Sequence, residues 1–215
     1  MSEKRTTCCF FIAIGILAVF VIAGMIYLFA TANEQAKITE ALRNAQHSDL
    51  QTGFLPAGIQ MPSALTKEEK DAFLADYMEQ VEQSYAADSQ IIPVYRVSKE
   101  SLLNSESEEI DCAIAEGLLN TKTHYILVWG NTAKVQITIT AWIKYIKEEK
   151  KVFEVYISVN KNRITAEMVK EDGEWKVLRY IEYHRLDGSS LGQVGFPCYE
   201  EAYDAAIEME ITHPF

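Results

Sequence analysis

Histidine is the side chain most often recruited as a general base near neutral pH. The chain has four of them, His47, His124, His184 and His213. None lies in a catalytic motif, and the phosphate-loop, dinucleotide-binding, zinc-protease and Gly-x-Ser-x-Gly patterns are absent from the sequence. We therefore expect structural or solvated histidines, no catalytic residue and no cofactor.

Carboxylates gather at one place where a cation could bind. Glu106, Glu108, Glu109 and Asp111 stand close together, but they lack the glycine and the alternating oxygen ligands of a calcium loop. Acidic residues also stabilise the positive N-terminal end of a helix, and this interpretation fits them better. The sequence predicts no metal site.

Four cysteines form two pairs in the sequence. Cys8 and Cys9 are adjacent, and we interpret them as apolar helix residues, with palmitoylation as the alternative. Cys112 and Cys198 fit no zinc or redox spacing. A disulfide between these two is an open alternative that an oxidising compartment would permit.

The charged residues are unevenly distributed. The 215 residues include 20 Lys or Arg and 31 Asp or Glu, which gives a net charge of −11. Residues 6–32 contain none of these. Because phosphate backbones are bound by basic surfaces, so acidic a chain argues against nucleic acid as a partner.

An unbroken apolar run occupies residues 8–30. A helix needs roughly 20 apolar residues to cross a bilayer, so we predict a transmembrane anchor that contacts lipid through this run. A buried core helix would carry a polar side, which the run lacks. A cleaved signal peptide is the other alternative, since Ala30-Thr31-Ala32 resembles a cleavage site. Its apolar core, however, is typically only about 7–15 residues long.

The flanks of the run predict its orientation. Lys4 and Arg5 precede it, whereas Asn33, Glu34 and Gln35 follow it. Cationic flanks stay in the cytoplasm. We expect a single-pass protein of the cell membrane, with residues 1–7 in the cytoplasm and the C-terminal domain outside it.

The outer chain divides into three expected parts. They are a stalk and linker over residues 31–63, a folded domain over residues 64–185, and a tail over residues 186–215 with a docking helix at Tyr199–Glu210. Thr66 and Glu69 have capping-box spacing, which predicts a helix from Lys67 to about Ala86. Ile91–Tyr95 is expected to be extended or turn-like, since Pro93 disfavours a helix at the residue before it. Two short helices are expected after it, over residues 99–104 and 108–119.

Apolar and polar residues then alternate, as in half-buried antiparallel strands. We predict strands over residues 125–129, 135–145, 153–159 and 175–183. Lys161-Asn162 bends the third strand or starts a hairpin, and Ile164, Ala166 and Met168 continue its apolar face. Asp172-Gly173 is expected to form the last tight turn. Helices followed by such strands predict an α+β domain with helices packed on an antiparallel sheet.

Three aromatic residues fall opposite the main apolar face of their strands. They are Trp142, Tyr156 and Tyr180. We expect them to line a second surface for a ligand or partner, or else to be covered by the tail helix.

Two segments carry a resemblance to a known family. Asn131–Val135 precedes a long alternating strand, and Val169–Val177 (VKEDGEWKV) places an Asp-Gly turn before a Trp-Lys strand. Over roughly Lys67–Tyr183 the chain resembles nuclear transport factor 2-like (cystatin-like cone) domains, including membrane-anchored bacterial ones. The resemblance implies a curved sheet around a helix and a cone-shaped pocket. Catalytic members place an Asp–His or Tyr–Asp set in that cone.

Such domains include enzymes, ligand binders and scaffolds, so the fold alone does not give the function. Our leading hypothesis is a non-catalytic interaction or scaffold module that holds a protein partner or a second copy at the extracytoplasmic membrane face. The bitopic subunits of secretion and conjugation machines have a similar plan. The alternatives are binding of a small apolar ligand or peptide in the cone and, third, a hydrolase or isomerase. A cone filled by side chains would favour the first.

Overall fold

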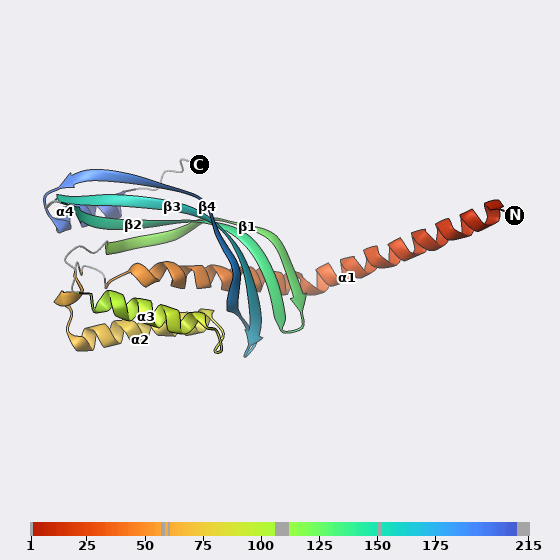
Figure 1. Ribbon diagram of the computed structural model, residues 1–215, viewed down its shortest axis with the longest axis horizontal. Helices are drawn as coiled ribbons and strands as arrows, with labels where there is room; N and C mark the ends of the chain where they lie inside the picture. The colour runs from red at the N-terminus through yellow and green to blue at the C-terminus, as the bar shows by residue number, and fades with distance from the viewer. Residues whose placement is uncertain (1, 57–58, 60, 106–111, 150–151, 210–215) are drawn as a thin grey trace. The chain divides into compact units, whose positions relative to one another are not determined.

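The computed structural model describes residues 2–56, 59, 61–105, 112–149 and 152–209 (Figure 1). Within these ranges, side chains are described except at residues 2–13, 112, 149 and 191–194. The chain divides into two compact units, Met1–Lys37 and Ile38–Phe215. Helices precede a curved antiparallel sheet along the chain, so the fold is α+β, as the sequence predicts.

The first unit is the N-terminal part of helix α1, whose full range is Ser2–Leu50. Its large apolar side chains between Ile14 and Phe29 are exposed. Within the described ranges, α1 is the one helix long and apolar enough to cross a membrane. A continuous apolar surface of this kind is stable only in apolar surroundings.

The remaining part of α1 belongs to the core of the second unit. Ile38, Leu42 and Ala45 are fully buried there, against residues of the helices and the sheet. The expectation of a stalk at these positions is wrong, because it rests on the polar residues between them. Their spacing of four and three residues is nevertheless that of one buried helix face.

Helices α2 (Lys67–Ser84) and α3 (Ile91–Leu103) follow. The capping box of α2 is confirmed: the Glu69 amide donates to Thr66 Oγ1, and the Glu69 carboxylate accepts from the Thr66 amide. The expectation of an extended Ile91–Tyr95 is wrong, since α3 begins at Ile91. Pro93 is only its third residue, and the first turn of a helix needs no amide donor there.

The sheet has four strands in the order β1-β2-β3-β4: Cys112–Trp129, Thr132–Glu149, Val152–Glu171 and Glu174–Phe196. The expected helix over residues 108–119 is strand from Cys112 onward, and its first residues lie outside the described part. Pairing with β2 decides this segment, a long-range effect that local helix signals miss. The Asp172-Gly173 turn is confirmed, with φ of 51° and 90°.

The two faces of the sheet are buried at opposite ends of the strands. We call the face that carries Ile137, Ile139 and Ile164 the inner face; it packs on α1, α2 and α3. The opposite, outer face carries Thr138 and Thr140 in mid-strand. Figure 1 shows that the sheet is curved and that its strands bend at the end where the two hairpin turns lie.

Strand β3 is continuous through Lys161-Asn162 but changes the face that it buries. Val155, Ile157 and Val159 are buried on the outer face, whereas Ile164, Ala166 and Met168 are buried on the inner face. The latter three therefore do not continue the apolar face of the former, as the sequence analysis expected. Different helices cover the sheet at the two ends of β3, and they determine which face is buried there.

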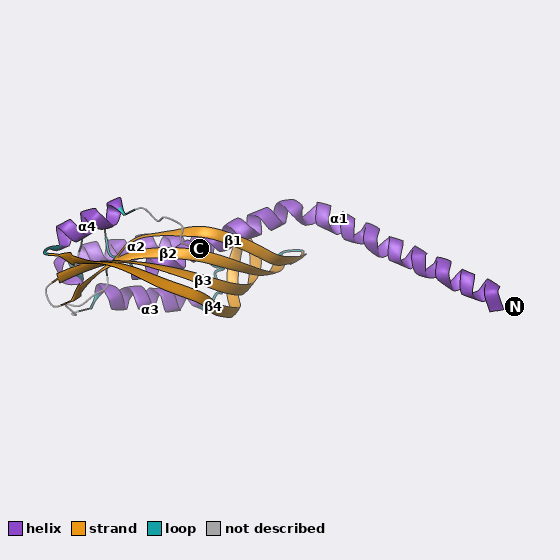
Figure 2. Ribbon diagram, turned by 90° about the horizontal axis from the view of Figure 1, so that it is seen from above, coloured by secondary structure: helices purple, strands orange, loops and turns teal. Residues whose placement is uncertain are grey.

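Helix α4 (Tyr199–Glu208) covers the outer face at the end away from the bend (Figure 2). Ala202 and Ala206 pack with Ile146 and Val155. This helix lies within the one expected at Tyr199–Glu210, whose last residue is outside the described part. The tail is not separate from the sheet, because β4 continues through the expected boundary at residue 185 as far as Phe196.

The pairings of the two edge strands, β1 and β4, are irregular, whereas the pairing of β2 with β3 is regular. The β2–β3 register has no shift, but β1 shifts at three places and β4 at four. Bulges at Leu119 and Leu186 are examples. Bulges bend a sheet and blunt its edges against pairing with further strands.

Candidate functional site

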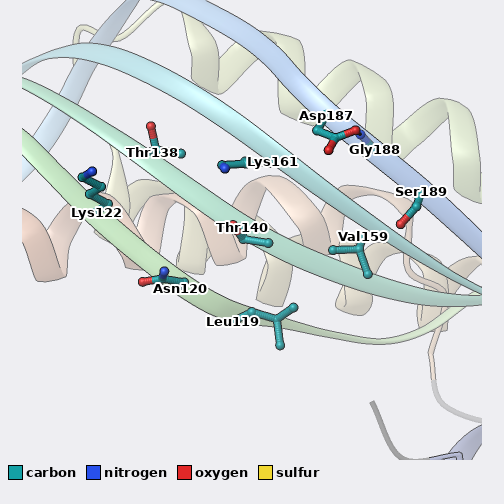
Figure 3. Close-up of a pocket in the computed structure, with 10 residues that line it drawn as sticks. All are labelled: Leu119, Asn120, Lys122, Thr138, Thr140, Val159, Lys161, Asp187, Gly188 and Ser189. Carbon is teal, nitrogen blue, oxygen red and sulfur yellow. The ribbon is translucent and has the colours of Figure 1, made fainter. Parts of the chain in front are cut away.

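A hollow of about 460 Å³ lies on the outer face, across all four strands. Its volume is within the range of small-ligand sites. Figure 3 shows the side chains that line it. They are Leu119, Asn120 and Lys122 of β1, Thr138 and Thr140 of β2, Val159 and Lys161 of β3, and Asp187, Gly188 and Ser189 of β4.

The strand register arranges these residues in rows across the sheet. One row is Asn120, Thr140, Lys161 and Asp187. The neighbouring row is Lys122, Thr138, Arg163 and His184. Three permanent cations from two strands thus stand together on one face, which no sequence spacing indicates.

A network of buried hydroxyl groups lies on the inner side of the sheet. The Tyr85 hydroxyl is 3.1 Å from that of Tyr95 and 2.8 Å from that of Tyr180. Tyr95 donates to Oδ1 of Asp49 at 2.5 Å, and the Gln46 amide donates to the Tyr180 hydroxyl at 2.8 Å. The network joins α1, α2, α3 and β4.

Burial disfavours the charged forms of the groups in this network. It raises the pKa of Asp49 above the usual 3.8, although the hydrogen bond from Tyr95 opposes the shift. It also raises the pKa of Tyr85, Tyr95 and Tyr180 well above the usual range. A Tyr–Asp pair is the kind of set that the family resemblance implies for an enzyme. Here Tyr85 is 0% exposed, and its hydroxyl bonds to those of Tyr95 and Tyr180.

A second buried polar group is Lys99, whose side chain is 1% exposed. Its Nζ donates to the carbonyls of Gln51 and Phe54 at 2.9 and 2.6 Å. It also lies 4.6 and 4.7 Å from the ring centres of Phe73 and Tyr77, which adds a cation–π attraction. Burial lowers the pKa of Lys99 to about 8.

One histidine has an acidic partner that the sequence did not reveal. Nδ1 of His47 is 2.8 Å from Oε1 of Glu116, which also accepts from Gln51. A carboxylate that orients a histidine is one element of general-base chemistry. Glu116 is on the inner face, whereas the hollow is on the outer face, so this pair does not serve the hollow.

The three aromatic candidates do not share a surface. Trp142 is on the outer face, with its indole against Gly117. Tyr156 is on the inner face and stacks on Tyr145 at 5.2 Å between ring centres. Tyr180 belongs to the buried network at the other end of that face. The sequence analysis grouped them because it assumed one buried face along each strand.

Of the four cysteines, only Cys198 has its side chain among the described ones. Cys198 is a free thiol immediately before α4. The side chains of Cys8, Cys9 and Cys112 lie outside the described ones, so lipidation and the disulfide stay predictions.

Metal ligands were sought among the described residues. Within these ranges, no group of three or more His, Cys, Asp or Glu side chains could hold a metal ion. The acidic cluster Glu106–Asp111 is outside the described residues.

Comparison with known proteins gives no relative from which a function could be transferred. No family model matches the chain, and no curated protein matches it significantly.

Proposed function

We propose that the chain is a single-pass membrane protein whose C-terminal α+β domain is a non-catalytic interaction or scaffold module outside the cytoplasm. The observation that carries the proposal is the exposed apolar surface of α1 between Ile14 and Phe29. Removal of such a surface from water is strongly favourable, and a bilayer provides the apolar surroundings. Lys4 and Arg5 support a cytoplasmic N-terminus.

The filled interior supports the scaffold role over the two alternatives. Side chains of α1, α2, α3 and the inner face form one buried cluster, in which Leu42, Val81 and Ile137 are fully or almost fully buried. An apolar ligand would have to displace these groups. A hydrolase or isomerase would need access to the Tyr–Asp network, in which Tyr85 and Tyr95 belong to the same buried cluster.

The arrangement also supports, as a proposal, the nuclear transport factor 2-like assignment. A curved antiparallel sheet bends around a helical segment, and two further helices lie on the same side. Together with the anchor, this plan suits a subunit of a membrane-associated assembly such as a secretion or conjugation apparatus. Its partner would be another protein or a second copy of the chain.

Thiol labelling in whole cells tests the anchor and its orientation. The variant Cys8→Ser/Cys9→Ser/Cys112→Ser retains only Cys198, which is partly exposed. A membrane-impermeant maleimide should label it in intact cells, and alkaline extraction should leave the protein in the membrane. The further change Cys198→Ser is the control. Labelling that requires cell lysis would overturn the orientation, and release by alkali would overturn the anchor.

Photo-crosslinking tests the interaction role. A photoreactive residue in place of Ser189, on the outer face, should give a discrete larger product in intact membranes. The matched control is the same residue in place of the exposed Asp88, in the α2–α3 connection. Absence of any product from outer-face positions would contradict the interaction module.

A further inference from the structure

The hollow on the outer face is a basic spot on an acidic protein. Lys122 and Lys161 line it, and Arg163 lies beside it, paired with Thr138 on the same face. All three side chains are exposed, although the chain as a whole has a net charge of −11. In the part of the chain that the structure describes, none of the three has an acidic partner within 4.0 Å. Asp187 lines the hollow at the β4 side, and its Oδ1 accepts from the Gly188 amide.

The spacing of these cations favours an extended acidic chain over a single oxyanion. Lys161 and Arg163 are two residues apart on one strand, which places their Cα atoms roughly 6.6 Å apart. Side chains at alternate positions of an extended peptide have the same spacing. Lys122 is two strands away from Arg163, or roughly 9.6 Å. A run of carboxylates along an extended peptide can therefore contact all three.

The floor of the hollow offers hydrogen bonds to the same kind of ligand. Asn120, Thr140 and Ser189 supply an amide and two hydroxyl groups between the charged residues. These groups can bond to peptide carbonyls and amides as well as to carboxylates. The side-chain chemistry is therefore that of a peptide groove with a preference for acidic residues.

We infer that the hollow on the outer face binds an extended acidic segment of a protein partner. The inference rests on the proposed interaction function and names the chemistry of its partner. Binding occurs on the sheet face and not at its edges, because the bulges of β1 and β4 hinder the addition of a further strand.

A binding measurement with a defined peptide tests the inference. The full chain in an uncharged detergent is titrated into a fluorescently labelled heptaglutamate peptide at low salt, and anisotropy is followed. Salt should weaken binding, since exposed charges are screened. Heptaglutamine of the same length should not bind over the same concentration range.

Matched variants locate the binding. Lys161→Gln combined with Arg163→Gln should weaken binding about five- to tenfold, since each exposed charge contact contributes a modest energy. Lys147→Gln, which changes another exposed lysine on the inner face of β2, should have less than about a twofold effect. Asp187→Asn should strengthen binding, because it removes the acidic residue and retains the oxygen that accepts from Gly188.

Four outcomes would overturn the inference. They are no binding of heptaglutamate, equal weakening by Lys147→Gln, displacement by inorganic phosphate at the molar concentration of the peptide, and equal affinity for a single-stranded oligonucleotide of the same charge. The last two would replace the peptide with a single oxyanion or a nucleic acid. None of these outcomes changes the results of labelling, extraction and crosslinking. Those three experiments test the proposed function separately.

Discussion

The Tyr95 hydroxyl donates to Oδ1 of Asp49 across 2.5 Å, and Asp49 belongs to the last turn of helix α1. This bond joins α1 to α3 inside the core. Burial raises the pKa of Asp49, so the native protein holds a proton at this carboxyl in a pH range where the unfolded chain has lost it. Burial of the Asp49 carboxylate therefore lowers the free energy of unfolding at neutral pH, and protonation in mild acid removes this effect.

Asp49→Asn tests this relationship. The amide oxygen can still accept from Tyr95, and the buried charge is gone, so we expect the variant to equal or exceed the native stability at pH 7. The native-minus-variant difference in the free energy of unfolding should rise as the pH falls through the raised pKa of Asp49 toward 3.8. Urea titrations in detergent at several pH values measure it.

Asp49→Ala is the companion variant. It leaves the Tyr95 hydroxyl without its acceptor inside the protein, which costs about 1–3 kcal/mol. If Asp49→Asn proves as destabilising as Asp49→Ala at pH 7, the buried carboxylate carries no cost there and the account of its raised pKa is wrong.

The stability that Lys99 contributes is predicted to change with pH in the opposite direction to that of Asp49. Its pKa is lowered to about 8 in the native protein, whereas an unfolded lysine keeps its proton to 10.5. The native state thus binds fewer protons above pH 8, and the stability from this group should rise with pH there, by at most about 1.4 kcal/mol per pH unit. Lys99→Met should remove the slope.

The same variant also carries a cost at neutral pH. It leaves the carbonyls of Gln51 and Phe54 without their donor, which should destabilise the protein by about 1–3 kcal/mol for each. Measurements from pH 7 to 9 keep the ionised fraction of each unfolded tyrosine below about a tenth. An unchanged slope in Lys99→Met would assign the pH dependence to another group.

Local signals account for the parts of the fold that the sequence predicts. The capping box at Thr66 and Glu69 and the turn at Asp172-Gly173 need only neighbouring residues, and both are confirmed. The alternation that predicts β2 is equally local. Ile38, Leu42 and Ala45 also have the spacing of one helix face, although the residues between them are mostly polar.

The hollow could not be predicted in the same way. Its lysines come from β1 and β3, and only the register places Lys122 and Arg163 in one row. The change of buried face within β3 depends on which helices cover each end of the sheet. For the same reason Trp142, Tyr156 and Tyr180 were grouped although they lie on different faces or at different ends. Properties that arise from packing between distant segments leave no spacing in the sequence.

Lys144 is predicted to hold helix α4 on the sheet. Its Nζ donates to the carbonyl of Ala206 at 2.8 Å and to that of Met209, at the negative end of the helix. Lys144→Met should loosen α4 and raise the rate of thiol labelling at Cys198 several-fold. Lys147→Met, on the inner face, is the control, and equal rates in both variants would assign the attachment of α4 to its apolar contacts alone.

Gly117 is predicted to be required by the indole of Trp142. A Cβ at this position would lie 2.7 Å from Nε1 and 2.8 Å from Cε2 of that ring, closer than any real contact. Gly117→Ala should displace the indole and destabilise the protein by about 1–3 kcal/mol, as overpacking does. Gly53→Ala, where an added Cβ meets nothing within 4 Å, is the matched control. In the Trp142→Phe background a smaller ring occupies the site, so the cost of Gly117→Ala should fall. An undiminished cost would show that the glycine serves the backbone of β1 and not the ring.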